Sequence, residues 1–172
     1  MAMTVEDAVA LFHRERDAIW LEAPDEIKVL ERGESPRGIG SRGQYLTPIM
    51  FAEGTARSLA DETLWVIALL CDRPGIDVPT IHQVIEEMVG RKAGFFELFG
   101  LEHAAERVRL FVEVAKTVDD PSELKALTEA VIGYVNRLHV WIDAAFPWGV
   151  CSGYMRAGYG RRGPDGLERP QR

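Results

Sequence analysis

Residues 120–147 read DPSELKALTEAVIGYVNRLHVWIDAAFP, and this stretch decides the fold class. It begins with three helix-start signals: Asp120 suits the N-cap, Pro121 the first helical position and Glu123 the third. Apolar residues then recur at helical spacing until Pro147 ends the pattern. They are Leu124, Leu127, Val131, Tyr134, Val135, Leu138, Ile142 and Ala145. A long helix that buries one face is therefore predicted.

Similar signals predict further helices on the N-terminal side of this stretch. A first helix begins at Thr4, because residues 4–7 resemble a capping box with Asp in place of Glu. Thr47-Pro48 begins another helix, which runs toward residue 71. Helical periodicity continues over residues 77–100 and 101–115. No stretch alternates like strands joined by hairpin turns, so the predicted fold is all-α, a compact bundle of about five to six helices.

Two of these helices carry specific predictions about burial. The run LWVIALLC at residues 64–71 is apolar on all sides, which predicts the most buried helix of the bundle. The helix at 77–100 is expected to bury one apolar face. That face consists of Ile81, Val84, Ile85, Met88, Phe95, Phe96 and Phe99.

Composition and charge exclude several classes of protein. The chain has 172 residues with a net charge of −7, and 47% of them are hydrophobic, as in ordinary globular domains. Two cysteines do not make a disulfide framework, so a reducing cytoplasm is expected. The longest apolar run has eight residues, well short of the roughly 18 that a membrane span needs. The acidic balance argues against a nucleic-acid partner.

The charge is unevenly divided along the chain. Residues 148–172 hold six glycines, five arginines and two acids, which gives them a net charge of +3 and leaves −10 for residues 1–147. We therefore expect a helical bundle domain over 1–147 and a Gly/Arg-rich C-terminal tail over 148–172. The tail is either a solvated terminus or an arm that contacts an acidic neighbouring subunit or an anionic ligand.

A glycine-rich loop is the candidate ligand site. Residues 38–43 read GIGSRG and match GxGxxG, but helical sequence precedes them, so they do not form a dinucleotide-binding turn and no cofactor is predicted. The loop leads into the helix at Thr47, whose dipole favours an anion. A small carboxylate or phosphate is expected to bind there, and a surface loop shaped by glycine is the alternative. The residues expected to bind it are Arg37, Gly38, Gly40, Arg42 and Tyr45.

Histidine supplies the candidate acid–base chemistry. His82 with Glu86, and His139 with Asp143, are four residues apart and are expected to pair on a helix surface. No HExxH motif is present and no metal site is predicted. His139 adjoins an aromatic segment, where it is a general base, a carboxylate-binding group or a structural histidine.

The same aromatic segment is a candidate interface. Trp141, Phe146 and Trp148 lie close together near the end of the last helix. Consecutive large apolar groups at 140–142 cannot all face one core, and tryptophan contributes heavily to interfaces. A homo-oligomer or a partner subunit is therefore expected, with a larger core closed by the tail as the alternative.

Two strings resemble a known family. GIGSRGQYLTPIMFAEGTARSLADETL (38–64) and YVNRLHVWIDAAFPWG (134–149) are similar to the helical-bundle domain at the C-terminus of cucumopine synthase. In that family the bundle follows a cyclophilin-like β-barrel, and the enzyme condenses histidine with 2-oxoglutarate without a nicotinamide cofactor. The resemblance covers roughly residues 4–149 and includes no β-barrel half. It implies a stand-alone helical subunit or a regulator, paired with a separate cyclophilin-like chain, and it supplies no catalytic residue.

Two functional hypotheses follow. The first is a cytoplasmic interaction or oligomerisation subunit that binds a small carboxylate and assists a cyclophilin-like catalytic partner. The second is a self-sufficient helical enzyme that acts on an anionic metabolite, with Arg37 and Arg42 as the anion clamp and His139 as the acid or base. Whether the chain is catalytic alone stays open at this point.

Overall fold

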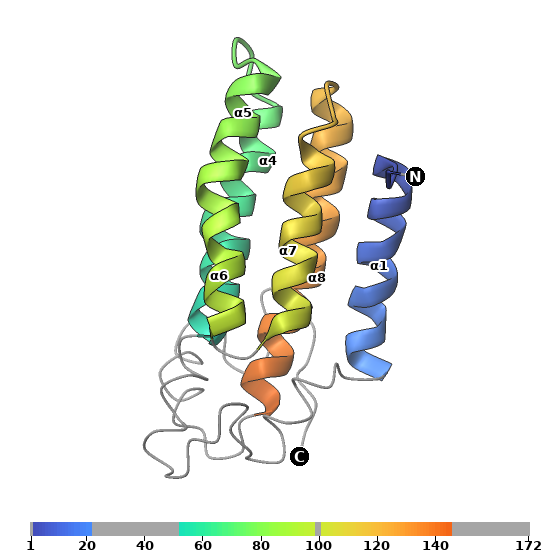
Figure 1. Cartoon of the computed structure of the whole chain (residues 1–172), viewed down its shortest axis with the longest axis vertical. Helices are drawn as coiled ribbons and strands as arrows, with labels where there is room; N and C mark the ends of the chain where they lie inside the picture. The colour runs from blue at the N-terminus through green and yellow to red at the C-terminus, as the bar shows by residue number, and fades with distance from the viewer. Residues whose placement is uncertain (1, 22–51, 99–100, 146–172) are drawn as a thin grey trace.

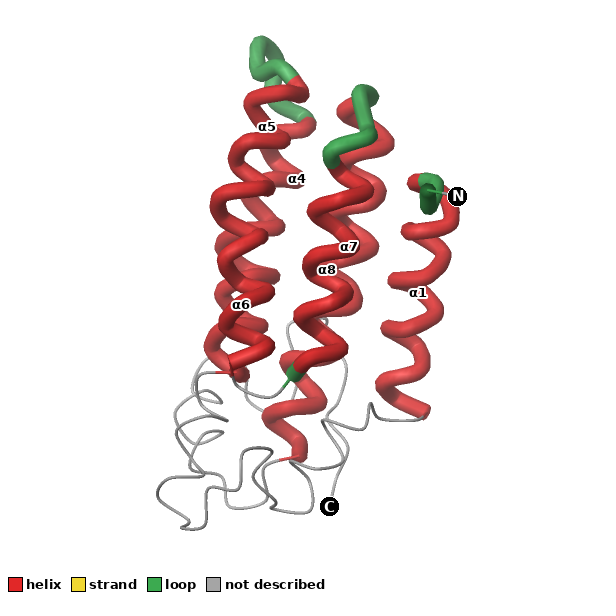
Figure 2. Tube along the Cα trace, in the orientation of Figure 1, coloured by secondary structure: helices red, strands yellow, loops and turns green. Residues whose placement is uncertain are grey.

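The computed structural model describes residues 2–21, 52–98 and 101–145, and in these ranges the chain is an all-α bundle of five continuous helices. Figures 1 and 2 show them as long rods that lie along a common direction, with the turns at 72–77 and 116–120 at the same end of the bundle. They are α1 (Val5–Leu21), the helix at 52–58 continued by η1 (Leu59–Leu64) and α4 (Trp65–Cys71), α5 (Val78–Val84) continued by η2 (Ile85–Val89) and α6 (Gly90–Leu98), α7 (Glu102–Ala115), and α8 (Pro121–Ala145). The predicted fold class is confirmed.

Side chains cap three of the described helix starts, and the sequence indicated two of them, Thr4 and Asp120. Thr4 Oγ1 accepts a hydrogen bond from the backbone N–H of Asp7 at 3.1 Å, which is the N-cap half of the predicted capping box. The Asp7 carboxylate accepts from the Thr4 hydroxyl at 2.8 Å, in place of the backbone N–H that the full box uses. Asp77 caps α5 through the N–H of Thr80 at 2.8 Å. Asp120 caps α8 through the N–H groups of Ser122 and Glu123. Local sequence therefore determines where these helices begin.

The long helix α8 holds the bundle together. It lies along α1 and also contacts η1, α4 and α7, whereas α6 lies along α7. Phe12 of α1 packs on Tyr134 of α8 with ring centroids 5.8 Å apart. Phe96 and Phe111 are buried in the same core. The centre of the bundle is therefore α8, as its length and apolar spacing suggest.

The prediction that residues 64–71 form the most buried helix is wrong. Ile67 and Ala68 are buried, but Trp65 is 56% exposed, Val66 45% and Leu69 52%. The helix α4 is covered by α8 and α5 but presents another side to solvent. Because a helix has 3.6 residues per turn, four consecutive side chains point in all directions around it. An apolar run on a helix at the edge of the bundle therefore exposes some of its side chains to solvent.

The predicted face of the helix at 77–98 is partly wrong. Ile81, Ile85 and Phe96 are buried as expected, but Met88 is 50% exposed and Phe95 46%. The buried stripe continues through Val89 and Ala93, each four residues after the preceding member. The π-helical turn η2 explains this spacing, because it contains more residues per turn than an α-helix and rotates the positions that follow. Phe99 lies outside the described residues.

None of the described helices combines the length and the apolar character that a membrane span requires.

Candidate functional site

A carboxylate and an imidazole meet in the interior of the bundle. Glu53, in the helix at 52–58, and His139, near the C-terminal end of α8, both have 0% of their side chains exposed. Nε2 of His139 and Oε1 of Glu53 share a short hydrogen bond. Burying two ionisable groups is costly unless they pair and hydrogen-bond to each other. This pair is the candidate functional site.

One oxygen of Glu53 and the side-chain oxygen of Asn136 lack donors among the described residues. Glu53 Oε2 and Asn136 Oδ1 are both buried, and neither has a hydrogen-bond partner among the residues that the structure describes. Asn136 precedes His139 by one turn of α8, which places both side chains on the same side of the helix. A buried acceptor without a donor costs free energy. Glu53 Oε2 is therefore an acceptor that the described residues leave unsatisfied.

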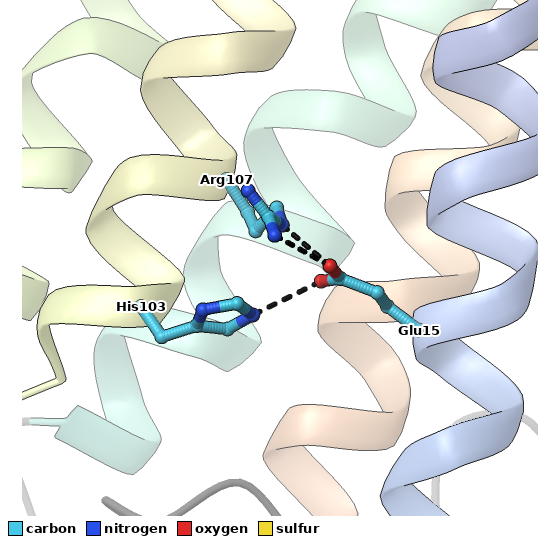
Figure 3. Close-up of polar contacts among 3 residues, drawn as sticks. All are labelled: Glu15, His103 and Arg107. Carbon is cyan, nitrogen blue, oxygen red and sulfur yellow. Dashed lines mark hydrogen bonds and ion pairs between the residues drawn. The ribbon is translucent and has the colours of Figure 1, made fainter.

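A second carboxylate–imidazole pair joins α1 to α7, and it is fully satisfied (Figure 3). Arg107 Nε donates to one oxygen of Glu15 at 2.7 Å, and His103 Nε2 donates to the other at 3.1 Å. Burial by itself raises the pKa of Glu15, but the hydrogen bonds and charges of His103 and Arg107 outweigh it and hold this pKa below its ordinary value. This cluster secures one helix to another and leaves no oxygen of Glu15 without a donor.

The predicted pair of His82 and Glu86 does not form. His82 does not pair with Glu86; its Nε2 contacts the backbone carbonyl of Val118 at 2.8 Å, and Glu86 forms an ion pair with Lys116 at 3.2 Å. The turn at 116–120 brings this carbonyl over α5, and i, i+4 spacing carries no information about it. The side chain of Asp143, the predicted neighbour of His139, lies outside the description. Across the described ranges, no three His, Cys, Asp or Glu side chains gather in a metal-binding group.

The predicted ligand loop and interface lie largely outside the described residues. This holds for Arg37, Gly38, Gly40, Arg42, Tyr45, Phe146 and Trp148, and for the side chain of Trp141, whose backbone belongs to α8. The helix ends that flank these segments are described. The C-terminal ends of α1, α6 and α8 and the N-terminal end of α7 lie at the same end of the bundle (Figure 1). The segment 22–51 is therefore attached at this end through α1.

Sequence reasoning missed Glu53, the partner of His139. A signal was present, because the buried positions of its helix, Ala52, Glu53, Ala56, Leu59 and Ala60, form one continuous stripe. A glutamate on an apolar stripe is exceptional, since charged side chains are rarely buried unless paired. Glu15 was missed as well, and the polar sequence around it does not distinguish it from a solvated residue.

Together these features define a class: a helical-bundle domain whose interior holds a carboxylate–imidazole pair. The chain belongs to the family of the cucumopine synthase C-terminal helical bundle domain, which matches residues 5–144. The match includes Glu53 and His139 and nearly all of the five helices. The family suspected from the two sequence strings is therefore confirmed.

A solved structure supports the same fold. The structure of McbB in complex with tryptophan superposes with a TM-score of 0.74 at 23% sequence identity over 87% of this chain. The match covers 48% of the McbB chain, so this chain spans about half the length of that relative. No curated protein sequence matches the chain closely enough to count as a relative.

Proposed function

We propose that the chain is the helical-bundle subunit of a larger enzyme. It binds a small carboxylate at the end of the bundle that holds Glu53 and His139, and it assists a separate cyclophilin-like catalytic partner. The observation that carries the proposal is the buried Glu53–His139 pair. A bundle that served for packing alone gains nothing from this pair, because apolar residues of similar volume are equally or more stabilising.

The comparisons support a role within a larger enzyme. The chain belongs to the family of a C-terminal domain, and the one solved structure described above is about twice as long. McbB binds tryptophan, an amino acid with a carboxylate, according to the description of its structure. By analogy, we propose an amino acid or a keto acid as the ligand of this chain.

The glycine-rich loop supplies the anion contacts in this proposal. Arg37 and Arg42 provide positive charge, Gly38 and Gly40 free the backbone N–H groups, and Tyr45 adds a hydroxyl donor. The loop precedes the helix that carries Glu53 in the chain.

The protein partner uses a different surface in this proposal. Trp141, Phe146 and Trp148 remain the candidate contact for a cyclophilin-like chain or for a second copy of this one. We place this assembly in the cytoplasm, because two cysteines in 172 residues suit a reducing compartment.

The buried pair also favours a second candidate function, a helical enzyme that works alone. Glu53 is positioned to orient the imidazole of His139, which is how a carboxylate supports a general base. In this alternative Arg37 and Arg42 clamp the anionic substrate and His139 moves the proton.

Calorimetric titration tests the binding proposal. We expect the purified chain to bind 2-oxoglutarate or L-tryptophan, and Arg42→Ala to weaken that binding by about tenfold or more, since one charge-assisted hydrogen bond is worth at least that factor. Arg73→Ala is the matched control, because Arg73 is exposed in the turn between α4 and α5. An unchanged affinity in R42A together with a lowered melting temperature would overturn the role of the loop.

A further inference from the structure

The exposed side of α4 is apolar. Within Trp65–Cys71 the exposed residues are Trp65, Val66 and Leu69, with exposed fractions of 56%, 45% and 52%. Helix α7 shows the opposite pattern, because each of its exposed residues is charged. These are Glu102, Glu106, Arg109 and Glu113. The exposed side of α7 is therefore that of an ordinary surface helix, whereas α4 presents to solvent the kind of side that helices bury.

The three exposed apolar residues of α4 form one patch. Trp65 and Leu69 are one turn apart, so they lie on the same side of the helix, and Val66 follows Trp65 directly and precedes Leu69 by one turn. Contiguous exposed apolar surface marks interaction sites, and tryptophan is among the residues that contribute most to binding at them. We therefore expect a partner to cover this patch.

Charges flank the patch in an order that is complementary to itself. Asp61 lies six residues before Ile67 and Arg73 six residues after it, and both are exposed. Trp65 and Leu69 lie two residues before and two residues after the same point. Reversing the direction of the helix therefore exchanges an acid for a base at each end and keeps an apolar residue at each position between them.

We propose that α4 binds α4 of a second copy of this chain, in an antiparallel arrangement around a two-fold axis near Ile67. In such a dimer each contact occurs twice. Trp65 packs on Leu69 of the other copy, and Asp61 forms an ion pair with Arg73 of the other copy. The order of the charges favours a second copy, because an unrelated partner requires no such symmetry.

One pair of like charges also meets in this arrangement. Glu62 lies five residues before Ile67 and Asp72 five residues after it. Each of them has a partner within its own chain. Ser58 Oγ donates to Glu62 Oε2 at 3.0 Å, and Lys125 Nζ donates to the carboxylate of Asp72. The ammonium group offsets the negative charge at this point, so the repulsion across the axis is small.

This surface is separate from the ligand loop and from the aromatic segment at 141–148. The turn at 72–77, into which α4 leads, and the C-terminal end of α1 lie at opposite ends of the bundle (Figure 1). A substitution of Arg73 therefore weakens the dimer without altering a contact of the proposed ligand loop. The dimer goes beyond the proposed function and is tested independently of it.

The size of the contact determines its expected strength. It extends over residues 61–73, which is about 18 Å of helix at a rise of about 1.5 Å per residue. Stable complexes bury about 1,200–2,000 Å² in total, and one pair of helices of this length buries less. We therefore expect a dissociation constant on the order of 10–100 μM. In dilute solution the copies separate, and unfolding then measures the single chain.

Sedimentation equilibrium of the whole chain tests this arrangement. We expect the wild type to dimerise at a concentration on the order of 100 μM, and Trp65→Ser to weaken the dimer by at least about tenfold. Asp61→Arg and Arg73→Asp should each weaken it as well, because either change places like charges across the axis. An equimolar mixture of D61R and R73D should dimerise again, since each contact of the mixed dimer joins an arginine to an aspartate.

A matched variant isolates the position of the charge. Glu106→Arg makes the same change of charge as Asp61→Arg, but on the exposed side of α7, and should leave the dimer unchanged. Circular dichroism checks that each variant is folded. If one charge variant does not fold, the comparison of wild type with W65S carries the test.

The outcomes decide between the possible surfaces. A wild type that stays monomeric at this concentration would overturn the proposal. A dimer that W65S and D61R leave at full strength would do the same, because its interface would lie elsewhere. If the two charge variants dissociate and their mixture stays monomeric, the two-fold pairing of Asp61 with Arg73 is wrong. Carboxylate binding is measured separately by calorimetry, so either proposal can fail alone.

Discussion

Glu53 and His139 are 86 residues apart in the sequence and form a contact inside the bundle with neither side chain exposed. The contact joins the helix at 52–58 to α8, at the part of the fold where α8 ends. It is the most deeply buried polar contact between side chains that the structure describes. Its removal should therefore affect stability strongly.

Replacing His139 by Leu should destabilise the protein by about 3–5 kcal/mol, because the Glu53 carboxylate is left buried without its partner. The double variant Glu53→Met/His139→Leu should recover most of this loss, since an apolar pair of similar volume needs no charge compensation. Urea unfolding of both single variants and the double variant measures the coupling. Additive losses would show that the two side chains do not act as a pair.

The Glu15 cluster predicts a stability effect that depends on pH. Its carboxyl pKa is lowered from 4.5 in the folded state, so the ionised form contributes stability at higher pH, and this contribution is lost as the pH falls below 4.5. At pH 7, Glu15→Gln should lower the melting temperature by about 2–4 °C, which corresponds to about 1 kcal/mol.

Thermal melts of wild type and E15Q between pH 7 and pH 3 check the sign. The difference between them should shrink as the pH falls below 4.5. A difference that stays constant over this range would mean that the charge of Glu15 does not contribute to stability.

Neighbouring residues of the apolar run at 64–71 should respond in opposite ways to substitution. Trp65 is 56% exposed, so Trp65→Ser should change the free energy of unfolding by no more than about 0.5 kcal/mol. Ile67 is fully buried, and Ile67→Ala should cost about 2–5 kcal/mol through the cavity that it leaves. Chemical denaturation of the two variants compares them directly. A comparable loss in both would contradict the exposed side of α4.

Helix positions were predictable because their signals are local. The capping residues Thr4, Asp77 and Asp120 act within three residues of themselves, and apolar spacing defines the helices between them. Which side of a helix faces the core depends less on local sequence. The π-helical turn η2 moved Met88 and Phe95 out of the core, and no rule based on a period of 3.6 residues anticipates an added residue in one turn.

The candidate site was only half predictable for a similar reason. His139 was recognisable as a rare titratable side chain near the end of a long helix. Its partner was not, because Glu53 lies 86 residues away and helix–helix packing alone brings the two together. The contact of His82 was unpredictable for the same reason, because the backbone carbonyl of Val118 lies 36 residues away in the sequence.

Reconstitution of catalysis tests the central claim most directly. Three samples are incubated with 2-oxoglutarate and L-histidine or L-tryptophan: this chain, a candidate cyclophilin-like partner chain, and the two together. Mass spectrometry then measures the condensation product. If this chain is a subunit that completes a partner's active site, the mixture forms product at least about tenfold faster than either chain alone. Product formed at the full rate by this chain alone, or by the cyclophilin-like chain alone, would contradict the account.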